Sequence, residues 1–285
     1  MNKCCCLILN YNDSETTIRL LQLIYAYSSI DQILVVDNNS TDESFSQIAQ
    51  YEDSRITVIR SEKNGGYGYG NNYGIRYARE NLGCSEILLA NPDVVFSNDF
   101  VAELLETMRT YKDAAIVAGI QHDVYDKEIT EKAWKIPTAF RYAFTFTQKS
   151  MKLAQTHYSE ELFRNHKILL VDCVPGALLL INPVIFEKLG GYDENIFLYC
   201  EEDIIGQKVK AGGYKTLLVC HVSYIHQHGV SIEKSISSKL KQRKMINHNK
   251  LYFMKKYLQA NLFEMLIARI ISRLDILFLR ARDLL

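Results

Sequence analysis

Four short apolar runs in the first 95 residues alternate with segments of helical periodicity, and this alternation constrains the fold more than any other feature. The runs are Cys4–Leu9, Gln32–Val36, Arg55–Arg60 and Ser85–Ala90. Their length and composition are typical of buried β-strands. Strands that alternate with helices at this spacing form βαβ units. The sequence therefore predicts an α/β fold with a mostly parallel, Rossmann-like central sheet flanked by helices.

A polar cluster follows each of the apolar runs. The clusters are Asn10–Asn12, Asp37–Asp42, Asn64–Asn72 and Asn91–Asp93. Any one of them is an ordinary turn signal. Ligands of open parallel sheets bind beyond the carboxyl ends of the strands, so four clusters at these ends predict a binding site along one edge of the sheet. A P-loop is absent from the sequence, and so is a GxGxxG motif in the first βα turn, which argues against a kinase-like or dinucleotide site.

Three consecutive acids, Glu201, Glu202 and Asp203, stand directly before a helical pattern over Ile204–Ala211. Adjacent carboxylates repel one another, so the cluster costs stability unless a cation, a substrate hydroxyl or a helix N-terminus offsets it. One interpretation is that the acids only complement the helix dipole. The other is that at least one of them takes part in chemistry, for example as a general base.

Composition indicates a cytoplasmic protein with an acidic body and a basic C-terminal tail. The seven cysteines show no CxxC or Cys/His ligand spacing, so neither a disulfide framework nor a zinc site is indicated. From Ser238 onward there are 11 Lys and Arg residues against three acids, whereas 22 basic and 30 acidic residues precede it. Nucleic acid is not an expected partner, because the acidic body opposes a phosphate backbone.

The end of the tail, Leu262–Leu285, has the pattern of an amphipathic helix. Apolar residues share one face, and Arg269, Arg273 and Arg280 lie on the opposite face. These charges interrupt every run long enough to span a membrane. The helix is therefore expected either to pack on the catalytic domain or on a second subunit of a homo-oligomer, or to lie on an anionic membrane surface.

Residues 1–235 resemble family 2 glycosyltransferases with the GT-A fold, and most of all their bacterial rhamnosyltransferase and polysaccharide-synthesis branch. The resemblance implies a nucleotide-sugar-binding half (1–95), an acceptor half (96–235) and a C-terminal helical extension (236–285). The resemblance rests on eight segments that occur in the same order as in the family. They are LNYN (9–12), VVDNNSTD (35–42), NGGYGYGNNYGI (64–75), LLANPD (88–93), PGALLLI (175–181), GGYDENIFLYCEED (190–203), AGGYK (211–215) and IHQHGVS (225–231).

The resemblance implies a donor site for a UDP- or dTDP-sugar across the first two strands. Backbone amides of the glycine-rich segment would approach the diphosphate, because glycines impose no side chain. The base and ribose would contact the polar residues at the ends of the strands. The implied donor-binding residues are Asn10, Tyr11, Asn12, Asp37, Asn39, Asn64, Gly66, Gly70 and Asn71.

The resemblance also implies a divalent cation, Mn²⁺ or Mg²⁺, which offsets the charge of the departing diphosphate. Asp93 would be the carboxylate ligand and His226 the second ligand, with Asn91 assisting and His228 as a rival. Asn91-Pro92-Asp93 supplies one carboxylate where many relatives have Asp-x-Asp. A site with only one or two protein carboxylates suits Mg²⁺, which keeps several of its water ligands. A His ligand shifts the metal preference of the site toward Mn²⁺.

Glu202 aligns with the general base of the family, Glu201 precedes it, and Asp203 is the second candidate. Ile204 stands where relatives often have another Asp. The implied reaction is an inverting, single-displacement sugar transfer to a glycan or lipid-linked glycan in the synthesis of capsule or another cell-envelope polysaccharide. The implied location is the inner face of the cell membrane.

Two alternatives to this transferase remain. A sugar-phosphate nucleotidyltransferase would require a basic, glycine-rich first βα turn, which LNYNDSE does not provide. A non-catalytic sugar-nucleotide- or glycan-binding subunit would have no use for a base. The segment Gln121–Lys167 has no recognisable motif. Its Trp134, Pro137 and Phe140–Phe146 would form part of the acceptor pocket, a mobile flap, or a surface for packing or oligomer contact.

Overall fold

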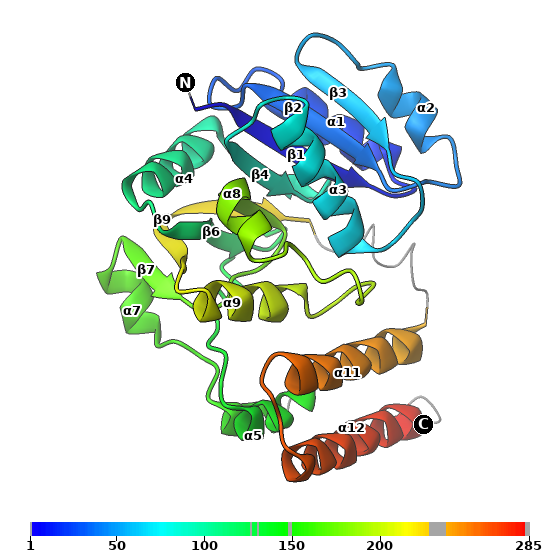
Figure 1. Ribbon diagram of the computed structural model, residues 1–285, viewed down its shortest axis with the longest axis vertical. Coiled ribbons are helices and arrows are strands. Elements are labelled where there is room, and N and C mark those ends of the chain that lie inside the picture. Colours follow the sequence, from blue (N-terminus) through cyan, green and yellow to red (C-terminus); the bar gives the residue numbers. More distant parts are fainter. Residues whose placement is uncertain (1, 126, 130, 148–149, 228–237, 283–285) are drawn as a thin grey trace.

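The parallel half of the sheet is built around β1 (Cys4–Asn10), in which only Leu9 is not fully buried. The computed structural model describes residues 2–125, 127–129, 131–147, 150–227 and 238–282. In it β1 lies between β2 (Gln32–Asp37) and β4 (Glu86–Ala90), and β3 (Ile56–Arg60) flanks β2. All of these pairings are parallel, so the polar segments after these strands lie along one edge (Figure 1).

The antiparallel strand pairings described for the sheet all involve its second half. Here β8 (Leu178–Ile181) runs between β4 and β6 (Ala114–His122) and opposes both of them. The long strand β9 (Lys215–His226) is parallel to β6, while β5 (Val94–Val95) and β7 (Ile168–Val171) oppose it. The strand order is β3-β2-β1-β4-β8-β6-β9-β5, with β7 paired to β9 off this path. Six of these nine strands, β1–β4, β6 and β9, run in the same direction, which confirms the prediction of a mostly parallel sheet.

Helices cover both faces of the sheet, and each face has its own hydrophobic cluster. On one face α1 (Ser14–Ile24), α2 (Ser44–Ala49) and α4 (Asn98–Thr110) contribute side chains such as Leu21, Ile48 and Leu104. On the other face lie α3 (Tyr67–Glu80), α8 (Pro183–Lys188) and α9 (Glu201–Ala211). The smaller helices are α5 (Ala139–Tyr142), the 3₁₀ helix η1 (Ala143–Phe146), α6 (Met151–Ala154) and α7 (Glu160–Asn165).

The glycine-rich segment differs from the open loop that the sequence predicts. The loop ends at Gly66, and α3 begins at Tyr67, so Gly70 is helical. A side chain at Gly70 would overlap Leu9, and a Cβ atom at Gly74 would lie 2.5 Å from the Cδ1 atom of Leu7. These glycines let the helix approach the sheet closely. The backbone amides of Tyr67 and Gly70 donate to the carbonyls of Phe197 and Gly66. The expected contact between the amides of this segment and a diphosphate stays a prediction.

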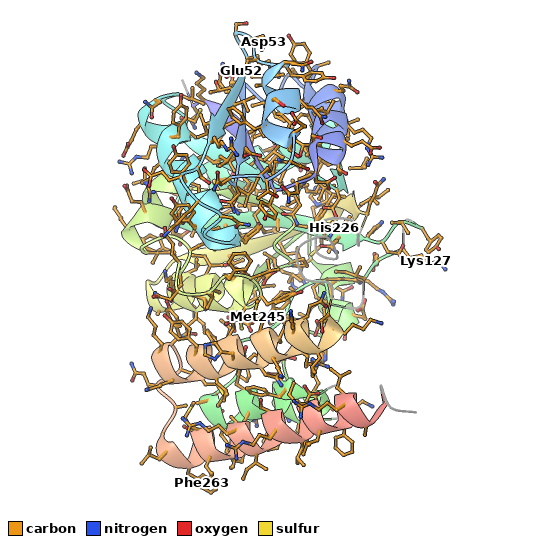
Figure 2. All side chains as sticks on the ribbon, turned by 90° about the vertical axis from the view of Figure 1, so that its right-hand side faces the viewer. Glu52, Asp53, Lys127, His226, Met245 and Phe263 are labelled. Carbon is orange, nitrogen blue, oxygen red and sulfur yellow. The ribbon has the colours of Figure 1, made fainter. Side chains whose placement is uncertain are left out.

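The C-terminal region forms two further helices, α11 (Lys239–Lys256) and α12 (Leu262–Arg282). In Figure 2, α11, which carries Met245, lies between the α/β part of the molecule and α12, which carries Phe263 at its outer side. A third hydrophobic cluster joins the helices to the part of the chain before them: Phe253, Met254, Met265 and Ala268 are buried with residues that include Tyr142, Phe146 and Ile204. None of the helices within the described ranges is long and apolar enough to cross a membrane.

Candidate active site

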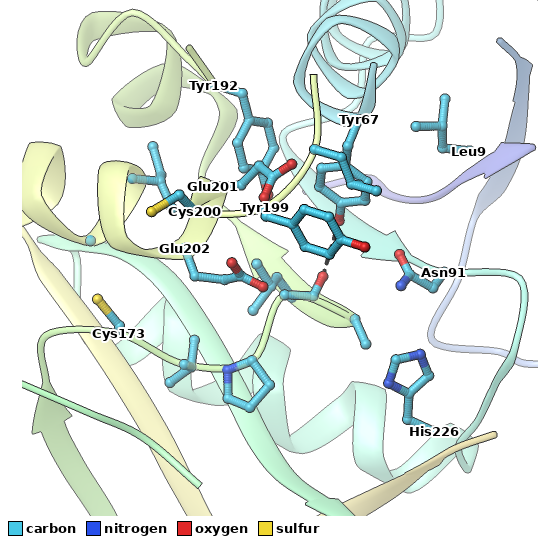
Figure 3. Close-up of a pocket in the computed structure, with 18 of the residues that line it drawn as sticks. Leu9, Tyr67, Asn91, Cys173, Tyr192, Tyr199, Cys200, Glu201, Glu202 and His226 are labelled. Carbon is cyan, nitrogen blue, oxygen red and sulfur yellow. Dashed lines mark hydrogen bonds between the residues drawn. The ribbon is translucent and has the colours of Figure 1, made fainter. Parts of the chain in front are cut away.

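A cavity of about 550 Å³ opens at the polar edge of the sheet and extends to the start of α9 (Figure 3). It brings together polar segments that the sequence keeps far apart. Eight of the expected site residues line it: Tyr11, Asn64, Gly66, Asn91, Asp93, Glu201, Glu202 and His226. The acids stand on one side of the cavity in Figure 3, and Asn91 and His226 stand on the other.

The remaining donor-site candidates are absent from the residues that line the cavity. Asn10 and Asp37 are fully buried, and Nδ2 of Asn10 donates to Oδ2 of Asp37 at 2.9 Å. Asp37 also accepts from the backbone amide of Ser40 at 2.9 Å. This network links the ends of β1 and β2. Because turn residues that bond to each other and residues that bind a nucleotide give the same sequence signal, the expected base contacts of Asn10 and Asp37 stay a prediction.

Two other candidates, Asn12 and Asn71, also have partners within the protein. The Nδ2 atom of Asn12 donates to Oγ1 of Thr41 at 3.1 Å, and its Oδ1 atom accepts from the backbone amide of Thr41. Nδ2 of Asn71 donates to the Tyr67 carbonyl, within α3. Asn39 has a positive φ of 58°, which is typical of Asn in a tight turn. Contacts of these residues with a donor likewise stay predictions.

Strand pairing places Asp93 and His226 side by side. β5 directly follows Asp93 and pairs with the end of β9, so that Val94 lies opposite His226. The Nε2 atom of His226 is 3.1 Å from Oδ1 of Asp93, and both side chains are less than 10% exposed. A carboxylate oxygen beside an imidazole nitrogen is a donor set that fits Mn²⁺. Among the described residues no group of three or more His, Cys, Asp or Glu side chains could hold a metal ion, and His228 lies outside these residues.

Glu201 and Glu202 form the acidic wall of the cavity. Both belong to the first turn of α9, as the sequence predicts. Glu201 is buried, and burial raises the pKa of its carboxyl group well above the ordinary value, with a further contribution from the charge of Glu202. Burial raises the pKa of Glu202 as well, and Asp203 adds to this effect. A carboxylate with a raised pKa is a stronger proton acceptor, which suits a general base.

Asp203 is not among the lining residues of the cavity, because its carboxylate has partners on another segment. It accepts from Nε1 of Trp134 at 2.7 Å and from the hydroxyl of Tyr142. These bonds fasten α9 to the segment that carries Trp134 and Tyr142. Trp134 itself lines the cavity, whereas Phe146 is buried in the third hydrophobic cluster. This segment therefore contributes both to the cavity wall and to packing.

Aromatic side chains make up a part of the cavity wall that the motifs did not single out. Tyr67, Tyr192, Phe197 and Tyr199 all line it. The rings of Tyr67 and Tyr192 meet edge to face with centroids 5.6 Å apart, and the Tyr67 hydroxyl donates to the Gly176 carbonyl at 3.0 Å. Their only signal in the sequence is their position beside motif residues, because no periodicity separates these tyrosines from those that only pack.

Residues 5–172 match the sequence profile of glycosyl transferase family 2. The chain belongs to this family. It is 29% identical over 199 residues to the low-salt glycan biosynthesis hexosyltransferase Agl10 of Haloferax volcanii, an alignment that covers 69% of this chain and 58% of that protein. It is 24% identical over 218 residues to an N-acetylglucosaminyl-diphospho-decaprenol L-rhamnosyltransferase of Mycobacterium tuberculosis, with 73% of this chain and 70% of that protein covered.

Solved structures agree with the family assignment at the level of the fold. GalNAc-T7 with UDP, GalNAc and Mn²⁺ superposes with a TM-score of 0.65 at 14% identity, covering 91% of this chain and 50% of that one. The mannosyltransferase PcManGT from Pyrobaculum calidifontis, in complex with GDP-Man and Mn²⁺, gives 0.56 at 13% identity, with coverages of 94% and 73%. This family 2 chain therefore has the predicted GT-A fold.

Proposed function

We propose that this family 2 chain is an inverting glycosyltransferase in glycan biosynthesis. Its donor would be a UDP- or dTDP-sugar, and its acceptor would be a hydroxyl group of a glycan or lipid-linked glycan. The observation that carries the proposal is one cavity with the Glu201 and Glu202 carboxylates on one wall and the Asp93–His226 pair on the other. A base and a site for a charged leaving group are the two requirements of sugar transfer by single displacement.

In the proposed reaction the carboxylate of Glu202 accepts the proton of the acceptor hydroxyl. The hydroxyl oxygen forms a bond to the anomeric carbon from the face opposite to the diphosphate. The bond between that carbon and the diphosphate oxygen breaks, and its electron pair leaves with the diphosphate. Tyr67 and Tyr199 offer apolar ring surface with polar tips at the cavity wall, a combination that suits contact with a sugar.

Asp93 and His226 would hold the divalent cation, with Asn91 as a further oxygen donor in the same cavity. When bound, such a cation offsets the negative charge that develops on the leaving diphosphate. A protein shell with one carboxylate is sufficient, because Mn²⁺ and Mg²⁺ sites of this kind are commonly completed by phosphate oxygens and water. The Mn²⁺ in both solved neighbours supports this assignment.

Calorimetric titration tests the proposed donor site. UDP, dTDP and GDP would each be added to the purified protein with Mn²⁺ and with EDTA. We expect metal-dependent binding of UDP or dTDP with a Kd on the order of 1–100 μM, and at least about tenfold weaker binding of GDP. The nucleotide that binds identifies the donor class. Failure of all three to bind in Mn²⁺ would overturn the proposal, and binding without any sugar transfer would favour a non-catalytic sugar-nucleotide-binding subunit.

The outer face of α12 supports a second part of the proposal, which concerns where the enzyme works. Its buried side chains are Met265, Ala268, Ser272 and Asp275. The opposite side of the helix is apolar yet exposed, with Leu262, Phe263, Leu266, Ile270, Leu274, Leu277 and Phe278 all at least 46% exposed. The inner side of the helix already packs in the third hydrophobic cluster, so a second apolar face that is exposed requires an explanation.

We propose that this face of α12 docks on an anionic membrane, at the inner face of the cell membrane. Arg269, Arg273 and Arg280 are exposed along one border of the apolar stripe. The sequence-based expectation that they lie on the opposite face is wrong, because that face carries the buried Met265, Ala268, Ser272 and Asp275. An anionic lipid surface attracts each such cation by about 1 kcal/mol, while the apolar side chains enter the boundary of the bilayer. A second copy of the chain is a less favourable occupant, because it would bring the same arginines close to one another.

Cosedimentation with vesicles of phosphatidylglycerol and phosphatidylcholine tests the membrane contact. We expect the double variant Leu266→Gln/Leu277→Gln to lower the bound fraction at least about fivefold, because two leucines stop contributing their burial energy. Leu170→Gln is the control, since Leu170 is equally exposed but lies on β7. Equal binding of wild type and double variant would contradict the proposal. A dimer that the double variant dissociates, without vesicle binding by wild type, would assign the face to a second copy.

A further inference from the structure

The turn that leads into α9 has an unusual backbone conformation. Tyr199 and Cys200 both have positive φ angles, 74° and 78°, although neither is glycine. Each such residue costs on the order of 1–3 kcal/mol, and the conformation persists only where surrounding contacts hold it. Cys200 is the N-cap residue of α9 and makes no side-chain capping bond. The conformation of this turn therefore decides where Tyr199 and the following Glu201 and Glu202 stand.

A side chain from the C-terminal helix α11 holds this turn. The Nδ2 atom of Asn249 donates to the carbonyl of Leu198 at 2.7 Å and to the carbonyl of Tyr199 at 3.1 Å. Asn249 is 3% exposed, so water does not substitute readily for these bonds. Loss of the amide would leave two carbonyl oxygens without this donor, and a buried polar group that loses its partner costs about 1–3 kcal/mol.

The same region of the C-terminus also holds the start of the loop. Asp193 accepts from the hydroxyl of Tyr252 and from Nζ of Lys256, both at 2.8 Å, and from the hydroxyl of Tyr257 at 2.5 Å. Between the two anchors, the backbone amide of Tyr67 donates to the carbonyl of Phe197 at 3.0 Å. The loop over residues 193–200 is thus attached at both ends to the region formed by α11 and Tyr257.

We propose that Asn249 is a positioning residue for the transfer reaction, acting through the turn Leu198–Cys200 on Tyr199 and Glu202. This inference rests on the proposed function. Tyr199 lines the cavity between the acidic wall and Asn91, and Glu202 is the second residue after the turn (Figure 3). Asn249 itself does not line the cavity, so its effect on the reaction is indirect. The donor-side residues Tyr11 and Asn64 lie on separate segments that α11 does not hold.

The chain offers a matched control on the same helix. Asn247 is also 3% exposed, and its Nδ2 atom also donates two bonds, to Oδ2 of Asp275 at 3.1 Å and to the carbonyl of Ser272 at 3.4 Å. Both of these partners belong to α12. Asn247→Ala therefore removes an equivalent buried amide from α11 without touching the turn before α9.

The experiment compares Asn249→Ala, Asn249→Asp and Asn247→Ala in the full-length protein. The first readout is kcat for hydrolysis of UDP-glucose or dTDP-rhamnose, whichever nucleotide binds, with water as the acceptor and nucleoside diphosphate and free sugar as the products. We expect both Asn249 variants to lower kcat about 10–100-fold, with Kd for the nucleotide within about twofold of wild type, because a small displacement of a catalytic group suffices for such a loss. Asn249→Asp preserves the shape but cannot donate. Asn247→Ala should keep kcat within about threefold of wild type. Its Tm should fall by about as much as the Tm of Asn249→Ala, because each variant loses one buried amide.

A second readout does not depend on activity. Hydrogen exchange of a peptide covering residues 194–200 should accelerate at least about tenfold in Asn249→Ala and remain unchanged in Asn247→Ala. Equal exchange in the two variants, or an unchanged kcat in Asn249→Ala, would overturn the positioning role. A wild type that binds nucleotide but transfers no sugar would instead overturn the proposed function, and the exchange measurement would still decide whether Asn249 holds the turn.

Discussion

Replacement of Glu202 by Gln should lower kcat for sugar transfer by about 10²–10⁴-fold, the range by which positioned general bases accelerate proton transfer. Gln has nearly the same shape as Glu but cannot accept the proton of the acceptor hydroxyl. Nucleotide affinity should stay within about twofold of wild type, because the Asp93–His226 pair stands on the opposite wall of the cavity. Initial rates and calorimetric titration of the same preparation separate the two quantities.

Asp203→Asn is the control for this experiment. The Asp203 carboxylate is engaged by Trp134 and Tyr142 and is absent from the cavity wall, so its replacement should act mainly on stability. We expect a lower Tm with kcat reduced by less than about tenfold, a smaller effect than loss of a general base produces. The opposite result, an inactive Asp203→Asn and an active Glu202→Gln, would move the base one position along the helix.

The pH profile of the wild type provides a second check on the same assignment. A base must be ionised to accept a proton, so kcat/KM should fall as the pH falls through the pKa of the acid pair. Because burial raises the pKa of both Glu201 and Glu202, this fall should occur above the ordinary range of a glutamate. Asp203→Asn removes the neighbouring negative charge that raises the pKa of Glu202, and the midpoint should then shift to lower pH. An unshifted midpoint would contradict this effect of Asp203 on the base.

The fold was predictable because its signals are local. Each of the first four strands is a short apolar run, and periodicity marks the helices between them. The acids in the first turn of α9 were also predictable, since the helical pattern follows Glu201–Asp203 directly. Asp93 and His226 are separated by 133 positions, and only the pairing of β5 with β9 brings them together. Their proximity is a property of the sheet, which no local pattern reveals.

Two features of the site were beyond sequence reasoning for physical reasons. Polar residues at strand ends give one signal whether they bond to each other or to a ligand, so the internal pairing of Asn10 with Asp37 was not foreseen. The charge of the tail suggested a surface partner, whereas its neutral Asn249 contacts the turn before α9. A single buried amide has no periodicity or charge that would distinguish it, so only the packed structure shows what it holds.

Loss of the carboxylate in Asp93→Ala should weaken nucleotide binding in Mn²⁺ by about 100-fold, or about 2.7 kcal/mol. Mutation of a residue that only supports a metal ligand typically lowers metal affinity 10–100-fold. Mutation of a direct ligand should therefore lower it by at least the top of that range. Nucleotide binding in EDTA should be the same in variant and wild type. EDTA removes the metal ion, so the Asp93 carboxylate of the wild type has no ion to hold. His226→Ala should reproduce the pattern with Mn²⁺ more than with Mg²⁺, since a nitrogen ligand favours Mn²⁺.

A second acid–histidine pair supplies the control for this prediction. The Nε2 atom of His221 lies 3.0 Å from Oε2 of Glu103, nearly the same separation as between His226 and Asp93, but both side chains are 43% exposed. His221 is also on β9, so the two histidines share one strand. Glu103→Ala should leave metal-dependent binding within about twofold, because a surface ion pair contributes little. Manganese paramagnetic resonance without nucleotide gives an independent readout: Asp93→Ala should bind less Mn²⁺ than Glu103→Ala. Equal Mn²⁺ binding by these two variants would remove Asp93 from the metal site.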